Sequence, residues 1–465
     1  MGRRLDPGNV ARLVDDVLAT AREFGEPGPE AQEILGAPLG DDQSQLEFAN
    51  RALRRTARRL AAQSPFYGRR FTAAAVDPVK LDVPALRKIP VTVKRDLIER
   101  PADFRCSDVA PYLATRTTGT TGHPAEVWLS RYEMELWPAL GTLASVLRDE
   151  LRPGDISQVN ISSRATAAMH LSATSCRLVG AGCRLLGIVP PDEALESLTE
   201  GGATLLLTCP SYLAELVTSA RRRGLGPSDF KLRRVTTGGE VLSPSLAQAA
   251  CRLFGVPRIE DPYSITEAIP ITARACSHGH LHHDLNLGHT ELLSLDSGDP
   301  AAPGELGTVV ITPYFPYRDC MPVFRYDTRD VARSLPVADL TCELAGIPAT
   351  SQILGKADHL LAPGPGEVVT SRQLVDAIEA LPAAPWPARY RATVVEGRLR
   401  LTLPAGAING QGMSETRRHF AAALGGLDVD LAVVGDEQAT SLRHTRSDLH
   451  ETTFADQHAL VGARQ

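Results

Sequence analysis

The apolar residues between about residue 45 and residue 60 recur every three or four positions. Leu46, Ala49, Leu53, Ala57 and Leu60 follow this spacing, and arginine pairs lie between them. Residues three and four apart lie on the same face of an α-helix. The pattern therefore predicts an amphipathic helix that packs its apolar side against a core and turns its arginines toward water.

Between residues 110 and 345 the pattern changes to short β-branched or aliphatic runs separated by helical stretches. Such runs occur at 157–161, 204–207 and 309–311. Alternating strands and helices favour a layered α/β fold with mostly parallel sheets. Because ligands of such folds bind at the carboxyl ends of the strands, we expect a site where glycine turns follow strands.

The two ends of the chain differ from this middle part. Residues 1–45 are acidic and contain a Pro/Gly-rich linker, which predicts a solvated N-terminal extension, with a capping or partner-binding role as the alternative. Residues 359–465 combine a helix at 371–378 with alternating stretches at 390–403 and 427–434. This combination predicts a small α+β unit.

Composition and charge restrict the class of partner. The 465 residues carry a net charge of −6 at pH 7 and a sequence pI near 6.1, which disfavours a nucleic-acid binder. The eight cysteines are too widely spread for a disulfide scaffold. Neither a signal peptide nor a membrane span is predicted, because long apolar runs are absent. We therefore expect a cytoplasmic protein without nucleic-acid or membrane partners.

The sequence Thr-Thr-Gly-Thr-Thr-Gly-His-Pro at 117–124 is the strongest candidate for binding chemistry. Glycine adopts positive φ angles, so successive backbone N–H groups of such a loop can point toward one anion. Threonine hydroxyls add donors for phosphate oxygens. No lysine follows the second glycine, which excludes a Walker loop. The sequence predicts another kind of phosphate loop, with an ordinary polar turn as the alternative.

Four further motifs follow this loop along the chain. They are Val-Thr-Thr-Gly-Gly-Glu at 235–240, Asp-Pro-Tyr-Ser-Ile-Thr-Glu at 261–267, Phe-Arg-Tyr-Asp-Thr-Arg-Asp at 324–330 and Gly-Lys-Ala-Asp at 355–358. With the loop at 117–124 they resemble the ordered motifs of the adenylate-forming superfamily, which includes the acyl-CoA synthetases. Two positions depart from the family pattern, since Ser264 replaces a glycine and His123 replaces the lysine of the phosphate loop.

Within this superfamily the chain resembles the phenylacetate-CoA ligases. The resemblance rests on Ser-Pro-Phe-Tyr at 64–67, Ile-Pro-Val-Thr-Val-Lys-Arg-Asp-Leu at 89–97 and Pro-Ser-Tyr at 210–212. It implies an α/β protein with a large N-terminal layered α/β domain and a small C-terminal α+β lid. The implied boundaries are an extension at 1–45, the large adenylation (AMP-binding) domain at 46–355 and the lid at 356–465.

The resemblance also implies roles for individual residues. The phosphate loop would comprise Thr117, Thr118, Gly119, Thr120, Thr121 and Gly122, and the remaining nucleotide contacts would come from Gly238, Gly239, Glu240, Asp261, Pro262, Tyr263, Asp330 and Lys356. Thr266 and Glu267 would act in catalysis, with the carboxylate helping to hold Mg²⁺. The alternatives are a surface carboxylate for Glu267, a helix cap or a pair with Arg329 for Asp330, and a plain tight turn for the two glycines.

The predicted lid lacks a lysine that the superfamily places near its end. None of the five lysines of the chain follows Lys356. The matching region offers Arg443, His444 and Arg446 instead, and the planar fork of arginine differs from an ammonium group in reach and geometry. Three explanations stay open: Arg443 or Arg446 acts in catalysis, the acid binds in another alignment, or adenylation is lost while nucleotide binding or a later half-reaction is kept.

A second cluster combines thiols and imidazoles between residues 276 and 342. Some phenylacetate-CoA ligase relatives have a zinc knuckle, and Cys276, His282 and Cys342 match it, although its paired C-x-C is reduced to one cysteine. Thiolate and imidazole ligands suit tetrahedral Zn²⁺. A fourth ligand would come from His280, Cys320 or Glu343. Such a zinc ion would be structural, and the alternative is a surface histidine cluster with unrelated buried cysteines.

These observations lead to one functional hypothesis and two rivals. The leading hypothesis is an ATP- and Mg²⁺-dependent ligase that activates a small aromatic acid and transfers it to coenzyme A, or to an amine or hydroxyl in specialised biosynthesis. The rivals are diazotase-like activation of nitrite on an aryl amine, and a non-catalytic nucleotide-binding scaffold. The partners would be the acid and the acceptor, and a homodimer is left open.

Overall fold

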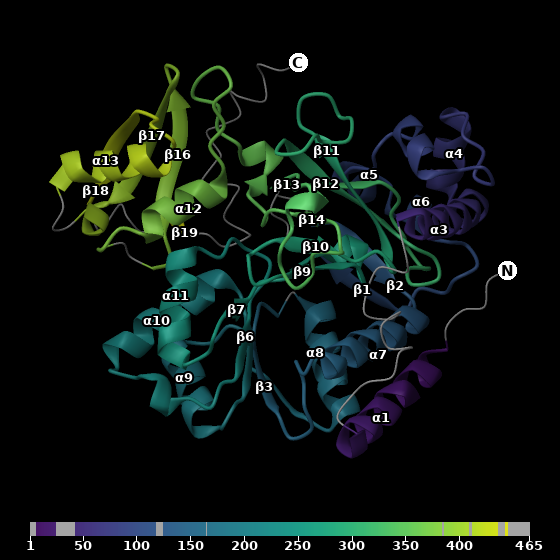
Figure 1. Ribbon diagram of the computed structural model, residues 1–465, viewed down its shortest axis with the longest axis horizontal. Helices are drawn as coiled ribbons and strands as arrows, with labels where there is room; N and C mark the ends of the chain where they lie inside the picture. The colour runs from purple at the N-terminus through teal and green to yellow at the C-terminus, as the bar shows by residue number, and fades with distance from the viewer. Residues whose placement is uncertain are drawn as a thin grey trace.

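The computed structural model describes residues 6–24, 42–117, 124–163, 165–383, 386–408, 412–435 and 442–444. Its body is built around a parallel sheet with strand order β4-β3-β5-β6-β7 (Figure 1). The strands of this sheet are β3 (Ile156–Asn160), β4 (Gly182–Leu185), β5 (Leu205–Thr208), β6 (Arg234–Thr236) and β7 (Ile259–Glu260). Helices connect them, as a parallel sheet requires.

Helices cover both faces of this parallel sheet. Leu206 belongs to the core beneath α9 (Pro191–Glu200), α10 (Pro210–Arg222) and α11 (Pro244–Phe254). The preceding residue, Leu205, belongs instead to a core with α7 (Arg131–Leu147) and α8 (Thr166–Val179). Successive strand residues point to opposite faces, so these two leucines show that the sheet is a buried central layer.

Two antiparallel sheets pack beside the parallel one. The first has the order β11-β12-β13-β15 and the second the order β14-β10-β9-β8. Their strands are β8 (Tyr263–Ser264), β9 (Thr272–Ala275), β10 (Leu281–His283), β11 (Gly288–Ser294), β12 (Leu306–Pro313), β13 (Tyr326–Arg333), β14 (Ala349–Thr350) and β15 (Gly355–Lys356). A hairpin of β1 (Leu113–Arg116) and β2 (Glu126–Leu129) flanks the loop at 118–123.

The expectation of mostly parallel sheets from 110 to 345 is therefore wrong for its second half. Between the described strands from β7 to β15 no helix is long enough for a parallel crossover, and β8 to β13 follow one another without an intervening α-helix. Strands joined in this way pair antiparallel. The run at 309–311 accordingly lies in the antiparallel strand β12.

Aromatic residues hold the N-terminal helices to this body. The elements are α3 (Asp42–Gln63), α4 (Pro65–Ala73), η1 (Val83–Lys88), α5 (Lys94–Glu99) and α6 (Pro101–Phe104). Tyr67 and Phe71 pack edge-on against Phe324, and the Tyr67 hydroxyl accepts the Phe324 backbone N–H at 2.7 Å. The helix predicted from the apolar spacing of residues 45–60 is confirmed as α3, with Leu53, Ala57 and Leu60 buried.

The first helix contradicts the expectation of a solvated extension. Helix α1 (Pro7–Phe24) packs mainly on α7 and also on α8. Val10 and Val14 are 3% and 0% exposed, respectively, because they face α7 residues such as Leu140 and Leu143. The proposed linker at 25–30 lies outside the described residues.

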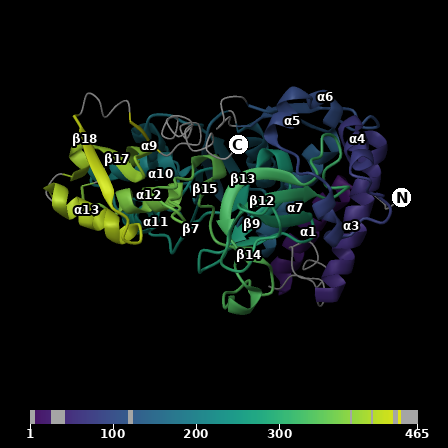
Figure 2. The same cartoon turned by 90° about the horizontal axis from the view of Figure 1, so that it is seen from above.

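The C-terminal unit sits over α11, at the opposite end of the molecule from α3 and α4 (Figures 1 and 2). Its sheet has the order β18-β17-β16-β19. Its elements are α12 (Ser371–Glu379), β16 (Arg389–Val395), β17 (Arg398–Pro404), η6 (Ala405–Ile408), α13 (Gly412–Ala423), β18 (Val429–Val434) and β19 (Arg443–His444). Arg372 donates hydrogen bonds to the carbonyl oxygens of Leu242 and Ile353, both at 2.8 Å, which ties α12 to the body.

Four short 3-10 turns complete the described elements, namely η2 (Pro227–Asp229), η3 (Thr266–Ala268), η4 (Val337–Asp339) and η5 (Ala357–His359). None of the described helices is both long enough and apolar enough to cross a membrane. The division of the chain at residues 45 and 355 stays a prediction.

Candidate active site

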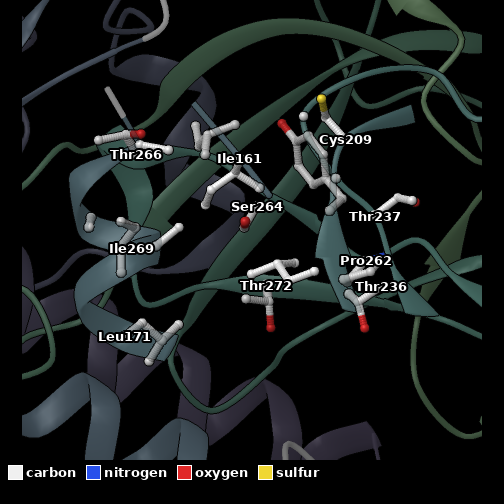
Figure 3. Close-up of a pocket in the computed structure, with 18 of the residues that line it drawn as sticks. Ile161, Leu171, Cys209, Thr236, Thr237, Pro262, Ser264, Thr266, Ile269 and Thr272 are labelled. Atoms are coloured by element: carbon white, nitrogen blue, oxygen red, sulfur yellow. The ribbon is translucent and has the colours of Figure 1, made fainter. Parts of the chain in front are cut away.

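A cavity of about 1760 Å³ lies against the parallel sheet and extends to Gly355, Lys356 and Asp358. It is lined by α7 and α8 on one side, by β6 and the turn after it, and by β8, β9, β13 and β15. Figure 3 shows Ile161, Ser264 and Ile269 around one part of it, together with Thr236 of β6 and Thr272 of β9. The carboxyl ends of β5 and β6 open into it, which is where ligands bind in α/β folds.

The turn after β6 brings three of the predicted nucleotide contacts to the cavity. Gly239 has a φ of +81°, which favours glycine at this position, and Gly238 and Glu240 flank it at the cavity wall. The Glu240 carboxylate accepts hydrogen bonds from Ser211 N at 2.8 Å and Ser211 Oγ at 3.1 Å, at the start of α10. Glu240 therefore fixes the turn to a helix N-terminus.

Asp261 and Pro262 lie beside this turn. Thr237 Oγ1 donates a hydrogen bond to Asp261 Oδ1 at 3.0 Å, which joins the end of β6 to the residue after β7. Burial raises the pKa of the Asp261 carboxyl, although Arg372 and the Thr237 hydroxyl counteract this effect. A half-buried carboxylate beside a glycine turn can accept hydrogen bonds from a ligand as well as from the protein.

Tyr263, Asp330 and Lys356 form a connected group on three different strands. The Tyr263 hydroxyl donates to Asp330 Oδ2 at 2.8 Å, and Lys356 Nζ lies 2.8 Å from Asp330 Oδ1. Lys356 also donates to the carbonyl oxygen of Thr328 at 2.9 Å. Burial and then the Asp330 charge raise the pKa of Tyr263, so its hydroxyl keeps its proton as a donor. The group places a carboxylate of fixed orientation at the cavity wall.

Glu267 is held by a residue from the same motif as Asp330. The Tyr326 hydroxyl donates to Glu267 Oε1 at 3.0 Å, and Glu267 is 8% exposed. Burial and then the Glu267 charge raise the pKa of Tyr326. Thr266 precedes Glu267 in η3, and both residues line the cavity. The carboxylate is therefore oriented by a phenol that stays protonated.

Tyr326 was not among the residues predicted for the site, yet the sequence contained a signal for it. Positions 326, 328 and 330 of a strand point to the same face. Tyr326 and Asp330, which are four residues apart on β13, both line the cavity. Choosing Asp330 from this motif should therefore have selected Tyr326 as well.

The phosphate loop is only partly described. Thr117 is buried at the cavity wall, where its N–H and its hydroxyl bond the backbone of Ala125 across the hairpin. Thr118, Gly119, Thr120, Thr121 and Gly122 lie outside the described residues. The hairpin of β1 and β2 brings Thr117, the residue that precedes this loop, to the cavity wall.

For the predicted lid cations the structure describes only the backbone of Arg443. Arg443 belongs to β19, where its backbone pairs with Tyr390 of β16. Arg446 lies outside the described residues. The role of either arginine in catalysis stays a prediction.

Helix α7, which forms one wall of the cavity, is anchored by a fully buried ion pair. Arg318 Nη1 lies 2.9 Å from Glu133 Oε1, and both side chains are 0% exposed. Glu133 also accepts the N–H of Ser130, and the Ser130 hydroxyl in turn caps the helix. A buried ion pair costs much free energy when one partner is removed, so this anchor holds Trp137 and Leu140 in the wall.

A separate cluster of possible metal ligands lies on β9, β10 and the segment before β14. It consists of Cys276, His280, His282 and Cys342, and their ligand atoms all lie within 4.8 Å of one another. Cys276 Sγ accepts the His280 backbone N–H at 3.2 Å. The His280 Nδ1 atom is buried and has no hydrogen-bond partner among the described residues. The donor set is that of a tetrahedral zinc site.

The structure therefore places the three predicted ligands together and adds His280 to them. Cys320, an alternative fourth ligand, lies instead beside the buried Glu133, whose carboxylate accepts the Cys320 N–H at 3.2 Å. Glu343, the other alternative, bonds Ser277 through both carboxylate oxygens. The four clustered residues do not line the cavity.

Residues 77–313, just over half of the chain, match the family described as AMP-binding enzyme. The chain is 24% identical over 306 residues to the phenylacetate-coenzyme A ligase of Pseudomonas putida, covering 64% of this chain and 67% of that one. It is 25% identical over 316 residues to the enzyme of the same name from Escherichia coli, covering 64% and 68%.

The fold is similar to that of solved ligases. A crystal structure of 2-hydroxyisobutyryl-CoA ligase in the postadenylation state superimposes with a TM-score of 0.73 and 18% identity over 89% of each chain. This similarity confirms the predicted α/β architecture. The chain therefore belongs to the AMP-binding enzyme family, as an AMP-forming ligase of the phenylacetate-CoA ligase-like branch.

Proposed function

We propose that the protein activates a small aromatic carboxylic acid with ATP and Mg²⁺ as an acyl-adenylate and then transfers the acyl group to an acceptor. Coenzyme A is the first acceptor to test, because the similar proteins from two bacteria are named as coenzyme A ligases. An amine or a hydroxyl compound is the alternative acceptor. The carboxylate of the acid attacks the α-phosphorus of ATP, and pyrophosphate leaves.

The linked group of Tyr263, Asp330 and Lys356 carries this proposal. Both Asp330 oxygens are oriented, one by the Tyr263 hydroxyl and the other by Lys356. A carboxylate held in this way can accept hydrogen bonds from the two hydroxyls of a ribose, since each oxygen keeps a further lone pair. The glycine turn at 238–239 lies in the same cavity and exposes backbone beside the expected position of the base.

Glu267 is the residue that we propose as the Mg²⁺ ligand. Mg²⁺ prefers oxygen ligands and binds through one or two carboxylates together with substrate phosphates. Glu267 fits this preference because it lines the cavity, while only its Oε1 atom accepts the hydrogen bond from Tyr326. When bound, the cation would stabilise the negative charge that develops on the phosphates. The hydroxyl of Thr266 would help to orient the phosphates beside Glu267.

Another part of the cavity lining is apolar and includes one aromatic side chain. Trp137, Ile161, Leu171, Ile269 and Ile271 line it. Such a lining favours a flat, hydrophobic acid over a short polar one. Aromatic acids are therefore the first substrates to screen, and phenylacetate is the natural starting compound because both similar ligases are named for it.

Release of pyrophosphate tests the proposed function directly. Purified protein is incubated with MgATP and a panel of aryl acids, with and without coenzyme A, and pyrophosphate is measured. We expect release that depends on one class of acid, and product mass spectrometry then identifies the acceptor. Nitrite with an aryl amine forms a second panel. Release only in this second panel would replace acid activation by diazotase-like chemistry.

The lid arginines can be examined in the same assay. Arg443→Ala and Arg446→Ala are compared singly with the wild type, since either guanidinium group would have to replace the missing ammonium group near the α-phosphate. We expect one variant to lose most of the adenylation rate while ATP still raises its melting temperature. Two unchanged rates would exclude both arginines. No release with any compound, combined with ATP binding, would favour a scaffold that has lost adenylation.

We also propose a structural zinc ion in the cluster of Cys276, His280, His282 and Cys342. Two thiolates and two imidazoles complete a tetrahedral site without an open position for substrate. The cluster lies outside the lining of the cavity, which supports a structural rather than a catalytic role. The ion would hold the hairpin of β9 and β10 to the segment that precedes β14.

A further inference from the structure

The cavity extends along one face of the parallel sheet, from the glycine turn toward the first residues of the strands. Arg234 and Thr236 of β6 and Gly238 of the turn all line it, and Figure 3 shows Thr236 at its wall. Residues two apart on a strand point to the same face, so these three residues form one row. Because four residues of extended chain span about 13 Å, the cavity covers about this length of the sheet.

The opposite face of β6 is packed, which makes the open face unusual. Val235, between Arg234 and Thr236, is 0% exposed and belongs to the core beneath α10 and α11. Arg234 and Thr236 are only half-buried. Protein interiors are close-packed and contain few voids larger than a water molecule. The space on the α7 side of the sheet therefore indicates room for a ligand.

Helix α7 forms the other wall of this space and runs along its length. Its lining residues recur at the spacing of one helix face and are Trp137, Pro138, Leu140, Gly141, Ala144, Ser145 and Arg148. Glu150, just after the helix, pairs with Arg234 at 3.3 Å. Trp137 packs on Ile269, two residues after Glu267. The helix face therefore leads from the proposed Mg²⁺ ligand toward the first residue of β6.

The middle of this helix face carries small side chains. Gly141, Ala144 and Ser145 line the cavity on α7, while Leu207 of β5 and Thr236 of β6 line it on the sheet. We call the space between these five residues the inner channel. Three side chains of at most two heavy atoms leave it unfilled. The channel lies behind the part of the cavity where the reacting carboxylate would meet the nucleotide.

The charged side chains at the end of the inner channel are balanced within the protein. Arg258 pairs with Glu260 at 2.5 Å and with Glu343 at 3.6 Å. Burial lowers the pKa of Arg274, and Glu150, Glu260 and Glu343 counteract this effect. This end therefore requires no ion from a ligand. Binding in the channel would come from apolar contact along its middle.

We infer that the aryl acid carries an apolar extension on the side of its ring remote from the reacting carboxylate, and that the inner channel binds this extension. The inference rests on the proposed function and narrows the substrate class to aryl acids with an alkyl tail or a second ring. Phenylacetate has one ring and a single carbon before its carboxylate, so it would leave the channel unfilled. Each methylene group buried there would raise the affinity about fourfold.

The experiment compares three acids in the pyrophosphate assay, namely phenylacetate, 4-butylphenylacetate and biphenyl-4-acetate. The two longer acids share the reacting end of phenylacetate and differ from it only behind the ring. At least one of them should have a kcat/KM about tenfold or more above that of phenylacetate, because its extension leaves water on binding. The gain should come mainly from a lower KM, since the extension does not take part in the reaction.

Two variants assign this preference to the inner channel. Ala144→Phe on α7 and Thr236→Phe on β6 would fill the channel from opposite walls. Each should reduce the ratio of longer-acid to phenylacetate kcat/KM by about tenfold. The two residues lie on different elements, so a folding defect in one variant leaves the other as a test. Ala422→Phe is the matched control, since Ala422 is exposed on α13 and is not among the described residues that line the cavity.

Calorimetric titration of the three acids into the wild type and both channel variants separates this inference from the proposed function. Tighter binding of a longer acid that is lost in both variants, without any pyrophosphate release, would support the channel and overturn acid activation. Equal kcat/KM for all three acids, with unchanged ratios in both variants, would overturn the inference and leave acid activation intact. Failure of both longer acids to bind more tightly than phenylacetate would also overturn it.

Discussion

Nε2 of His282 lies 3.2 Å from Sγ of Cys342, while Nδ1 of the same ring lies 2.8 Å from the carbonyl oxygen of Ile347. A carbonyl oxygen only accepts hydrogen bonds, so Nδ1 carries the proton and Nε2 presents its lone pair toward the thiol. A backbone acceptor behind a histidine ring is the usual way in which a metal ligand is oriented. The relationship explains why we expect a zinc ion rather than a simple thiol–imidazole contact.

Purified protein should accordingly contain about one zinc ion per chain. Cys342→Ser should lose this zinc and lower the melting temperature, because a structural metal contributes its binding free energy to folding. Elemental analysis and thermal unfolding measure the two effects. Cys183→Ser is the control, since Cys183 lies outside the cluster. Wild-type protein without stoichiometric zinc would contradict the site.

Asp330→Asn should weaken the binding of ATP and AMP. The substitution removes the charge that Lys356 faces at 2.8 Å and converts one acceptor oxygen into a donor. Hydrogen bonds to charged groups are worth about 1.5–3 kcal/mol, which corresponds to roughly ten- to hundredfold in affinity. Isothermal titration calorimetry measures the change. Asp430 of β18 forms an exposed ion pair with Arg400 of β17, so Asp430→Asn should leave the nucleotide affinity unchanged. Equal nucleotide affinity in Asp330→Asn and the wild type would exclude Asp330 from the ribose site.

Glu267→Gln should lower the rate of adenylate formation far more than it lowers nucleotide affinity. The substitution keeps the shape of the side chain but removes the proposed Mg²⁺ ligand, and losing one electrostatic group in an active site costs about 10²–10³ in kcat. Tyr326→Phe keeps the Glu267 carboxylate and removes only the 3.0 Å hydrogen bond to it. Its rate of adenylate formation should therefore lie between those of the wild type and Glu267→Gln. Rates are measured over a range of Mg²⁺ concentrations. A Glu267→Gln enzyme as fast as the wild type would refute the assignment.

Patterns along the chain were sufficient to predict the architecture and to select residues that meet in one cavity. The motifs containing Gly239, Tyr263 and Asp330 follow or form strands, and the fold brings these strands together. The order of the motifs along the chain therefore predicted which residues lie close together in the fold. The resemblance to a known family supplied the roles that spacing alone could not.

Contacts between distant segments could not be read from the sequence. The packing of Val14 on α7 depends on where the chain returns after residue 42, and the short connections after β7 decide that Val309 lies in an antiparallel strand. Likewise, three residues were equally good candidates for the fourth metal ligand, and only the pairing of β9 with β10 brings His280 to Cys276.

The attachment of α12 to the body should depend on pH through Glu379. This residue is 3% exposed, and it accepts hydrogen bonds from the Ser243 hydroxyl and from Ala388 N at 3.1 Å. Burial raises the pKa of Glu379 from 4.5 to about 6, because it disfavours the charged form. A carboxyl whose pKa is higher in the folded state binds its proton more tightly there. Its contribution to stability is therefore complete below pH 4.5 and is lost as the pH rises through 6.

Glu379→Gln mimics the protonated side chain at every pH and should not show this loss. The difference in unfolding free energy between the variant and the wild type should therefore shift in favour of the variant by up to about 2 kcal/mol between pH 4.5 and pH 7.5. Denaturant unfolding at several pH values measures this difference. Asp376, whose pKa burial also raises to about 6, is present in both proteins and cancels in the comparison. If the difference in unfolding free energy stays constant between pH 4.5 and pH 7.5, ionisation of Glu379 does not destabilise the contact between α11 and α12.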